Sequence, residues 1–192
     1  MNTSSQPWKE NRVGAVSLCY LNLQAPARDW VFAHHAAVGI RASLVCGEAE
    51  THLTLPAERN WDLLAERDDA ELRDALSILD GRKERGIFIA ESSPSVPPDA
   101  LYVLSTIEDT INDPAPDLSE PLPSFAAPTE LGLVLDWIHA VVNAGHWLIL
   151  RIDDKHLSEF GEATHRKLLR RLGDEHARIW CAPIRDIATY SP

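Results

Sequence analysis

Residues 13–21 read V-G-A-V-S-L-C-Y-L, an almost continuous apolar run that contains several residues favoured in strands. A run without polar alternation is typical of a strand in a parallel sheet, where both faces are covered. We therefore predict a buried strand over Val13–Leu21. Next along the chain we expect a helix over Arg28–Val38, ended by Gly39, and a second short strand over Ala42–Cys46.

The rest of the chain continues this alternation. Further strands are expected over Gly86–Ala90, Leu101–Leu104, His146–Ile152 and Arg178–Ala182, and helices over Trp61–Leu79, Leu131–Ala144, Ser158–Leu172 and Ile184–Tyr190. Asn112–Pro128 contains five prolines and is expected to be a loop. Strands that alternate with helices favour a parallel sheet with crossover helices. The pattern predicts an α/β fold, and it allows both an irregular or incomplete (β/α) barrel and an open doubly wound sheet.

Composition narrows the possible partners and compartments. The formal net charge of −11 over 192 residues argues against nucleic acid, which is bound by clustered Lys and Arg. The basic residues within Arg166–Arg171 are separated by leucines, so we expect them on the solvated face of a helix. No apolar run approaches the length of about 18 residues that a membrane span needs. We expect no membrane partner, and the sequence does not predict an oligomeric state.

The first residues and the cysteines indicate a cytoplasmic protein. Residues 1–12 form a polar leader without the apolar stretch of a signal peptide, ahead of a single domain over residues 13–192. Cys19, Cys46 and Cys181 lie in apolar runs, which favours buried reduced thiols over disulfides. No glycine-rich phosphate loop follows any expected strand, and this excludes most nucleotide-dependent functions.

Five blocks of sequence stand out in order along the chain. They are Ala15–Leu23 (A-V-S-L-C-Y-L-N-L), Val38–Val45 (V-G-I-R-A-S-L-V), Phe88–Leu101, Leu135–Ile152 and Ile179–Ala188 (I-W-C-A-P-I-R-D-I-A). In the same order they resemble blocks of the polysaccharide deacetylase (NodB-homology) family, beginning with its T-F-D-D-G strand and its G-(V/I)-x-A-T-F-F-V block. The resemblance covers most of the chain, and it implies an irregular or incomplete (β/α) barrel of the polysaccharide deacetylase type.

The resemblance also implies a chemistry that this sequence has lost. Family members hydrolyse an N-acetyl amide with a metal-bound water, using two aspartates of the first motif, two histidine ligands and a late histidine. Here the base aspartate falls at Leu21, the ligand aspartate at Asn22 and the late histidine at about Asp153. Both histidine ligands are missing after Trp61–Ala65, where the second motif would follow. The resemblance therefore implies a catalytically degenerate member with no metal and no cofactor.

Other residues offer a relocated site. Asp153, Asp154 and His156 follow an expected strand, where α/β barrels place catalytic groups. The competing interpretation is a solvated turn in which Asp154 or Ser158 caps the next helix. Glu91–Ser93 could also supply a nucleophile, although no base is identifiable beside it.

Several histidines on expected helices are candidate metal ligands. His34 and His35 are adjacent, so their side chains diverge by about 100°, and we expect one to be buried and one exposed. The pairs Asp136 with His139 and Glu162 with His165 each share a helical face, but a two-residue match is a weak sign of a metal site.

Six tryptophans complete the candidate residues. We expect Trp8 to be exposed in the leader and the other five in the core, namely Trp30, Trp61, Trp137, Trp147 and Trp180. The hypothesis that follows is a binding or regulatory module of deacetylase-like fold, directed toward a carbohydrate. The alternative is an active hydrolase of carbon–nitrogen bonds that acts on an N-acetyl sugar or a small amide. A third reading is an unrelated α/β scaffold.

Overall fold

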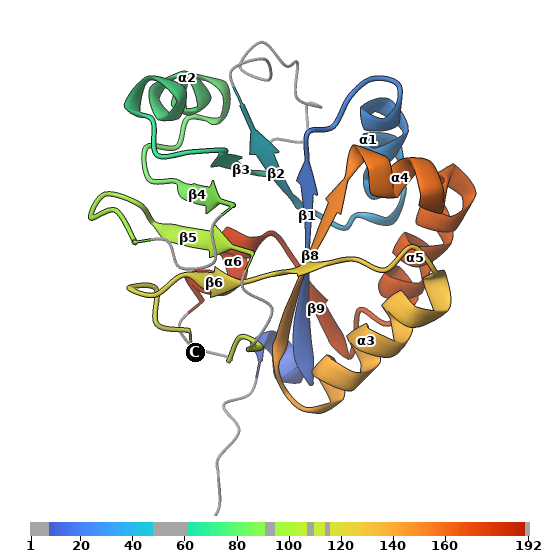
Figure 1. Cartoon of the computed structure of the whole chain (residues 1–192). Coiled ribbons are helices and arrows are strands. Elements are labelled where there is room, and N and C mark those ends of the chain that lie inside the picture. Colours follow the sequence, from blue (N-terminus) through green and yellow to red (C-terminus); the bar gives the residue numbers. More distant parts are fainter. Residues whose placement is uncertain (1–7, 48–60, 91–94, 107–109, 114–115, 191–192) are drawn as a thin grey trace, which may run out of the picture.

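The computed structural model describes residues 8–47, 61–90, 95–106, 110–113 and 116–190, which form a curved sheet and the helices around it (Figure 1). The strands are β1 (Gly14–Leu21), β2 (Ser43–Cys46), β3 (Asp62–Ala65), β4 (Gly86–Ile89), β5 (Tyr102–Ser105), β6 (Leu122–Pro123), β7 (Phe125–Ala126), β8 (Trp147–Asp153) and β9 (Ile179–Cys181). A 3-10 turn, η1 (Lys9–Asn11), precedes them, and the helices are α1 (Ala27–Val38), α2 (Ala70–Asp80), α3 (Leu131–Asn143), α4 (Asp154–Phe160), α5 (Glu162–Asp174) and α6 (Ile184–Ala188).

The strands form one parallel sheet that curls into a barrel. Its order is β6-β5-β4-β3-β2-β1-β8-β7, and β9 pairs with the first half of β1. The two ends of this path, β6 and β7, are separated in the chain by Ser124 alone. The segment 122–126 therefore pairs with β5 through Leu122 and with β8 through Phe125, which closes the sheet. The predicted irregular (β/α) barrel is confirmed, and the open sheet is excluded.

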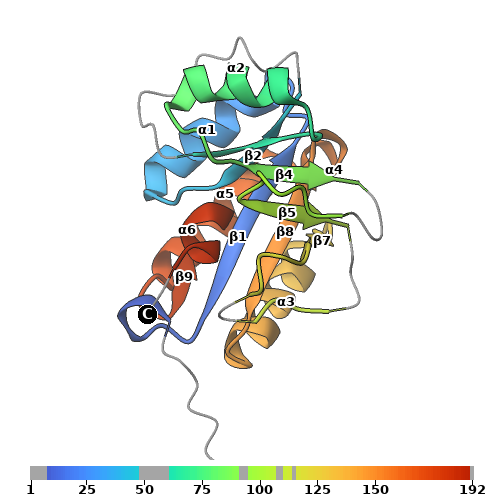
Figure 2. The same cartoon turned by 90° about the vertical axis from the view of Figure 1, so that its left-hand side faces the viewer.

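Hydrophobic side chains pack on both faces of the strands, as the apolar run of β1 predicts. Alternate residues of β8, Trp147 and Ile149, face the barrel interior together with Cys19, while Leu148 and Leu150 face the helical layer. The helices α1, α3 and α5 cover the outside of β1 and β8 (Figure 1). Helix α6 lies beside the first half of β1 and contributes to the interior core (Figure 2).

The helix predicted over Trp61–Leu79 is wrong in its first part. Asp62–Ala65 is strand β3, which pairs in parallel with β2, and α2 begins only at Ala70. Asp69 caps this helix by accepting a hydrogen bond from the backbone N–H of Leu72 at 3.1 Å. The strand is only four residues long and begins with a carboxylate, and so short a run gives no periodicity that separates a strand from a helical turn.

Two further boundaries differ from expectation. The helix predicted over Ser158–Leu172 is two helices, because Gly161 adopts φ 76° between α4 and α5. The proline-rich stretch is not a plain loop, because β6 and β7 lie within it. Gly39 has φ 68°, so the predicted end of α1 at this glycine is confirmed, and Gly81 with φ 73° ends α2 in the same left-handed way.

The structure tests the predictions made for Trp8, for Trp137 and for the three cysteines. Trp8 is only 3% exposed, so its predicted exposure is wrong, and its indole N–H donates to the carbonyl of Gly145 at 3.0 Å. Trp137 is 41% exposed and does not lie in the core. The cysteines are free thiols as predicted, and burial raises the pKa of Cys181 to about 12. Within the described ranges, no helix is long and apolar enough to cross a membrane.

Candidate functional site

The positions that the sequence identified as degenerate meet at one end of the barrel. Strands β1 and β8 run in parallel, and their register places Leu21 directly opposite Asp153. Asn22 follows in a left-handed conformation with φ 53°, and its side chain is exposed. These are the carboxyl ends of the strands, where (β/α) barrels carry their active sites. We call this end, defined by Leu21, Asn22 and Asp153, the mouth of the barrel.

The carboxylate of Asp153 has a structural role. It caps α4, because its Oδ1 accepts a hydrogen bond from the backbone N–H of His156 at 2.6 Å. The capping residue is therefore Asp153, and the expectation of Asp154 or Ser158 is wrong. The reason is that α4 starts immediately after β8, with no intervening turn. This leaves the carboxylate of Asp154, in the first turn of α4, without a capping role.

His156 lies in the same turn, but it does not form an acid–base pair with the carboxylates. Its side chain is buried at 9% exposure, and its ring packs on Phe160 at a centroid distance of 5.3 Å. Its Nε2 has no hydrogen-bond partner among the described residues. Burial lowers the pKa of His156, which favours the neutral imidazole. The relocated candidates Asp153, Asp154 and His156 are thus neighbours that share one helical turn.

The donors at the mouth do not fit a divalent metal. Leucine offers no ligand atom, and the neutral amide of Asn22 is a weaker ligand than a carboxylate. Nowhere in the described ranges do three His, Cys, Asp or Glu side chains converge to hold a metal ion. Glu91–Ser93, the possible nucleophile loop, lies outside the described residues. Asn22, Asp153 and Asp154 can instead donate or accept hydrogen bonds with a polar ligand.

Sequence reasoning missed one residue near the mouth. Arg151 stands on β8 two residues before Asp153, on the side that faces the interior, and its register partner is Cys19. Its Nη2 donates to the carbonyl of Ser124 at 3.2 Å, across the segment that closes the barrel. The signal was present in the alternation of the run H-W-L-I-L-R-I, which places Trp147, Ile149 and Arg151 on one face.

The two adjacent histidines do not divide into one buried and one exposed residue. His34 is 7% exposed and His35 is 1% exposed, so the prediction is wrong. Their side chains do diverge, but both directions are covered by protein. His35 reaches Tyr20 on β1, and His34 reaches His165 on α5.

The helical pairs considered as metal ligands are engaged elsewhere. The ring of His139 contacts Glu175 at 3.0 Å, and Asp136 is exposed. Glu162 pairs with Arg166 at 2.7 Å, while His165 is turned inward and is fully buried. The basic residues of α5 are exposed, as predicted for a solvated face.

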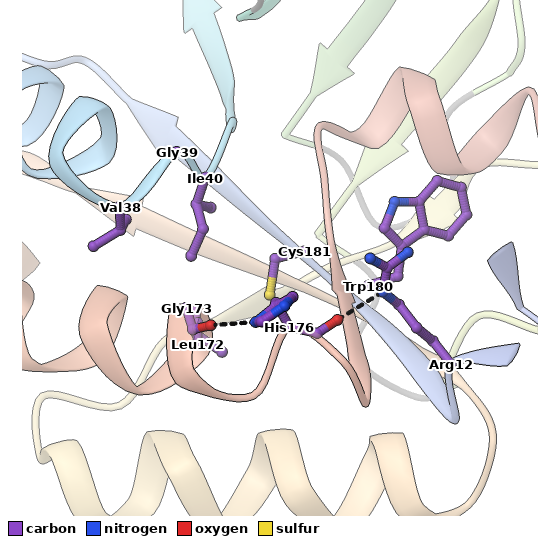
Figure 3. Close-up of a pocket in the computed structure, with 9 residues that line it drawn as sticks. All are labelled: Arg12, Val38, Gly39, Ile40, Leu172, Gly173, His176, Trp180 and Cys181. Carbon is purple, nitrogen blue, oxygen red and sulfur yellow. Dashed lines mark hydrogen bonds between the residues drawn. The ribbon is translucent and has the colours of Figure 1, made fainter. Parts of the chain in front are cut away.

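A hollow of about 410 Å³ lies at the other end of the barrel, between the ends of α1 and α5 and strand β9 (Figure 3). Arg12 is already engaged there, because its Nε donates to the carbonyl of His176 at 2.7 Å and its Nη2 pairs with Glu10 at 3.0 Å. The ring of His176 donates to the carbonyl of Gly173 at 2.9 Å. Cys181 lines the hollow as a neutral thiol, so this arrangement contains no activated nucleophile. The mouth is the better candidate site.

Comparison with known proteins identifies the fold. No family model matches the sequence, and no curated protein matches it. Among solved structures, Puue allantoinase aligns with a TM-score of 0.65 and 12% identity, over 94% of this chain and 91% of that chain. A peptidoglycan N-acetylglucosamine deacetylase aligns with a TM-score of 0.56 and 11% identity, over 95% of this chain and 91% of that chain.

The chain has the fold of these two proteins. The fold that the deacetylase resemblance implied is thereby confirmed. At such low identity the likeness concerns the fold alone.

Proposed function

We propose that this chain is a binding or regulatory module built on a deacetylase-like barrel, and that its ligand is a carbohydrate carrying an N-acetyl group or a related small amide. One observation carries the proposal. The register of β1 and β8 puts Leu21 and Asn22 at the mouth, where the family resemblance would require two aspartates. A leucine side chain accepts no proton, and the third position, Asp153, is engaged as a helix cap.

The nature of the ligand follows from the fold and from the polar groups at the mouth. The two solved structures of the same fold are named as an allantoinase and as a deacetylase of N-acetylglucosamine in peptidoglycan, and these names support an amide-containing ligand. The carboxamide of Asn22 and the carboxylate of Asp154 can hydrogen-bond sugar hydroxyls and an acetamido group. One amide and one carboxylate that both form hydrogen bonds suit a polar ligand without negative charge.

Three measurements test this function. Metal content is measured by elemental analysis after incubation with zinc, cobalt, nickel or manganese salts and dialysis. Deacetylase activity is measured as acetate released from N-acetylglucosamine oligomers. We expect no stoichiometric metal and no acetate. Calorimetric titration with the same oligomers should show saturable binding that Asn22→Ala weakens by about tenfold, as for loss of about one hydrogen bond. Asn143→Ala, an exposed asparagine at the end of α3, is the matched control and should bind normally.

A stoichiometric metal together with acetate release would overturn the proposal. So would the absence of binding to N-acetylated oligomers, to their deacetylated forms and to small amides.

A second function is supported by the position of His156. Among the described residues its Nε2 has no hydrogen-bond partner, and His156 shares the first turn of α4 with the carboxylates of Asp153 and Asp154, so a neutral imidazole is available there as a metal-free general base. This hydrolase hypothesis requires turnover of an N-acetyl sugar or a small cyclic amide by the wild-type chain. His156→Gln should then abolish turnover, whereas Ser158→Ala on the exposed side of α4 should not.

Asp153→Asn removes the negative charge of this residue and retains a good helix cap, so it separates a chemical role of Asp153 from its structural one. If the wild-type chain hydrolyses none of these substrates, the hydrolase hypothesis is wrong.

A further inference from the structure

Three buried histidines and a tyrosine form a continuous hydrogen-bonded chain between β1, α1 and α5. The Tyr20 hydroxyl lies 2.8 Å from Nε2 of His35 and 2.7 Å from Nε2 of His165. Nδ1 of His165 lies 3.0 Å from Nδ1 of His34. The exposed fractions are 0% for Tyr20 and His165, 1% for His35 and 7% for His34. We call these four residues the histidine chain.

The two ends of the histidine chain fix the position of every hydrogen. At one end, His35 Nδ1 lies 2.9 Å from the carbonyl of Ile40, which can only accept, so this nitrogen carries a hydrogen. Burial favours the neutral form of this ring, so its Nε2 accepts from the Tyr20 hydroxyl. At the other end, Nε of Arg166 can only donate, so Nε2 of His34 accepts, at 3.2 Å.

The remaining hydrogen positions in the histidine chain follow from those at its two ends. Nδ1 of His34 carries the hydrogen and donates to Nδ1 of His165. The hydrogen of His165 is therefore on Nε2, which donates to the Tyr20 oxygen. The assignments made from both ends agree at Tyr20, whose hydroxyl accepts one hydrogen bond and donates one. All three histidines are neutral in this arrangement, and every ring nitrogen is used.

A neutral chain of this kind has no place for another proton. A proton added at His35 Nε2 would meet the Tyr20 hydroxyl hydrogen, and one added at His165 Nδ1 would meet the hydrogen on His34. Burial acts in the same direction, since it lowers the pKa of His35 to about 4 and that of His165 to about 2. The hydrogen bonds of the histidine chain are therefore stable only while all three histidines are neutral.

The position and the charged neighbours of His34 make it the first member of the histidine chain to bind a proton. A hollow of about 260 Å³ opens beside His34, lined also by Ala37, Val38, Arg166 and Arg170. Burial lowers the pKa of His34, and the charge of Arg166, followed by that of Arg170, acts in the same direction. Glu162 opposes them from 3.5 Å, and on α4 His156 is the remaining titratable group that acts on His165. A first proton can reach Nε2 of His34 and turn it from Arg166 toward Glu162.

We propose that the histidine chain is an acid-sensitive latch between α1 and α5, which holds the two helices together while it is neutral and loosens them when protons enter it. Loosening reaches the mouth of the barrel, because α1 begins only a few residues after Asn22. The latch is independent of which function the mouth performs.

The hydrogen positions can be tested directly on the wild-type chain. Long-range proton–nitrogen NMR spectra of the imidazole rings at pH 7.5 report the tautomer of each histidine. We expect hydrogens on Nδ1 of His34, on Nδ1 of His35 and on Nε2 of His165. A charged ring at this pH, or the opposite tautomer at any of the three, would overturn the proposal. This measurement needs no variant and so does not depend on whether an altered chain folds.

The loosening can be tested by amide hydrogen exchange between pH 7.5 and 5.0, corrected for the intrinsic exchange rate. Below pH 6.5 the opening equilibrium of α1 and α5 should rise by up to about tenfold per pH unit for each histidine that opening exposes. Helix α3 should respond much less, since it contains no member of the chain.

His34→Gln retains a donor and an acceptor without a titratable ring, so the pH dependence of α1 should become shallower. His139→Gln on α3 is the control and should leave that dependence unchanged. Equal pH dependence in α1 and α3 of the wild-type chain would contradict the latch.

Discussion

The buried ion pair between Asp80 and Arg85 allows a quantitative test of how α2 is fastened to the barrel. The side chains are 3% and 2% exposed, and the pair is bidentate, with Nη2–Oδ1 and Nη1–Oδ2 distances of 2.8 and 3.2 Å. The guanidinium also donates to the carbonyl of Leu63 on β3 at 2.7 Å. Asp80→Ala leaves this buried cation without its counterion, which costs about 3–5 kcal/mol of unfolding free energy. That is a large part of the about 5–15 kcal/mol typical of a domain.

Urea denaturation followed by tryptophan fluorescence measures the loss. With a denaturant slope of about 2.5 kcal/mol/M, the midpoint should fall by about 1.2–2 M. The double variant Asp80→Leu with Arg85→Met should be more stable than Asp80→Ala, because it buries no unpaired charge. Glu10→Ala, which breaks the exposed pair with Arg12, should shift the midpoint much less. A loss below about 1 kcal/mol in Asp80→Ala would refute the reasoning, since exposed pairs are worth that little.

Four further changes have clear expected outcomes. Gly14→Ala should strongly lower the melting temperature, because the new Cβ would lie 2.8 Å from the backbone oxygen of His146, just before β8. The Cβ of Gly132→Ala would meet no atom within 4 Å, so this substitution should raise the melting temperature slightly. Trp8→Ala should cost about 3–5 kcal/mol by urea denaturation, because this side chain is only 3% exposed, and a loss under 1 kcal/mol would show that it is not part of the core. The free energy of unfolding, measured from pH 7.5 to 5, should fall as the pH drops below about 6.5, because His35 and His165 bind protons in the unfolded chain but not in the folded one. The expected decrease is up to about 1.4 kcal/mol per pH unit for each of these histidines. A free energy that does not change with pH would contradict their burial as neutral groups.

Much of the fold could be predicted from the sequence because its signals are local. The apolar run of β1 and the left-handed glycine at Gly39 each depend on neighbouring residues only. Strand β3 could not be recognised in this way. Its first residue, Asp62, is a carboxylate that is only 2% exposed, and a charged residue normally argues against a buried strand. It is accommodated by hydrogen bonds from the Tyr102 hydroxyl and from the backbone N–H of Arg185, and both partners are distant in the sequence.

The candidate site was predictable to a similar extent. Motif alignment marked Leu21 and Asn22, and both lie at the carboxyl end of β1. Their role in a binding site stays a prediction. The histidine chain was not predictable, because Tyr20 and His165 are 145 positions apart and their contact depends on the packing of α5 against β1. Whether a histidine is buried depends on which partners the fold brings to it, and helical spacing alone does not contain that information.

The closing segment 122–126 gives the barrel a seam. Its strands β6 and β7 have two residues each, compared with eight in β1 and seven in β8. Pro123 has no backbone N–H, so at this position of the sheet only its carbonyl can form a hydrogen bond. That carbonyl accepts a hydrogen bond from Nδ2 of Asn112 at 2.9 Å. Local opening of a sheet begins where its ladder is weakest. If this short segment separated from β5 and β8, the other strands would still be joined to one another as an open parallel sheet.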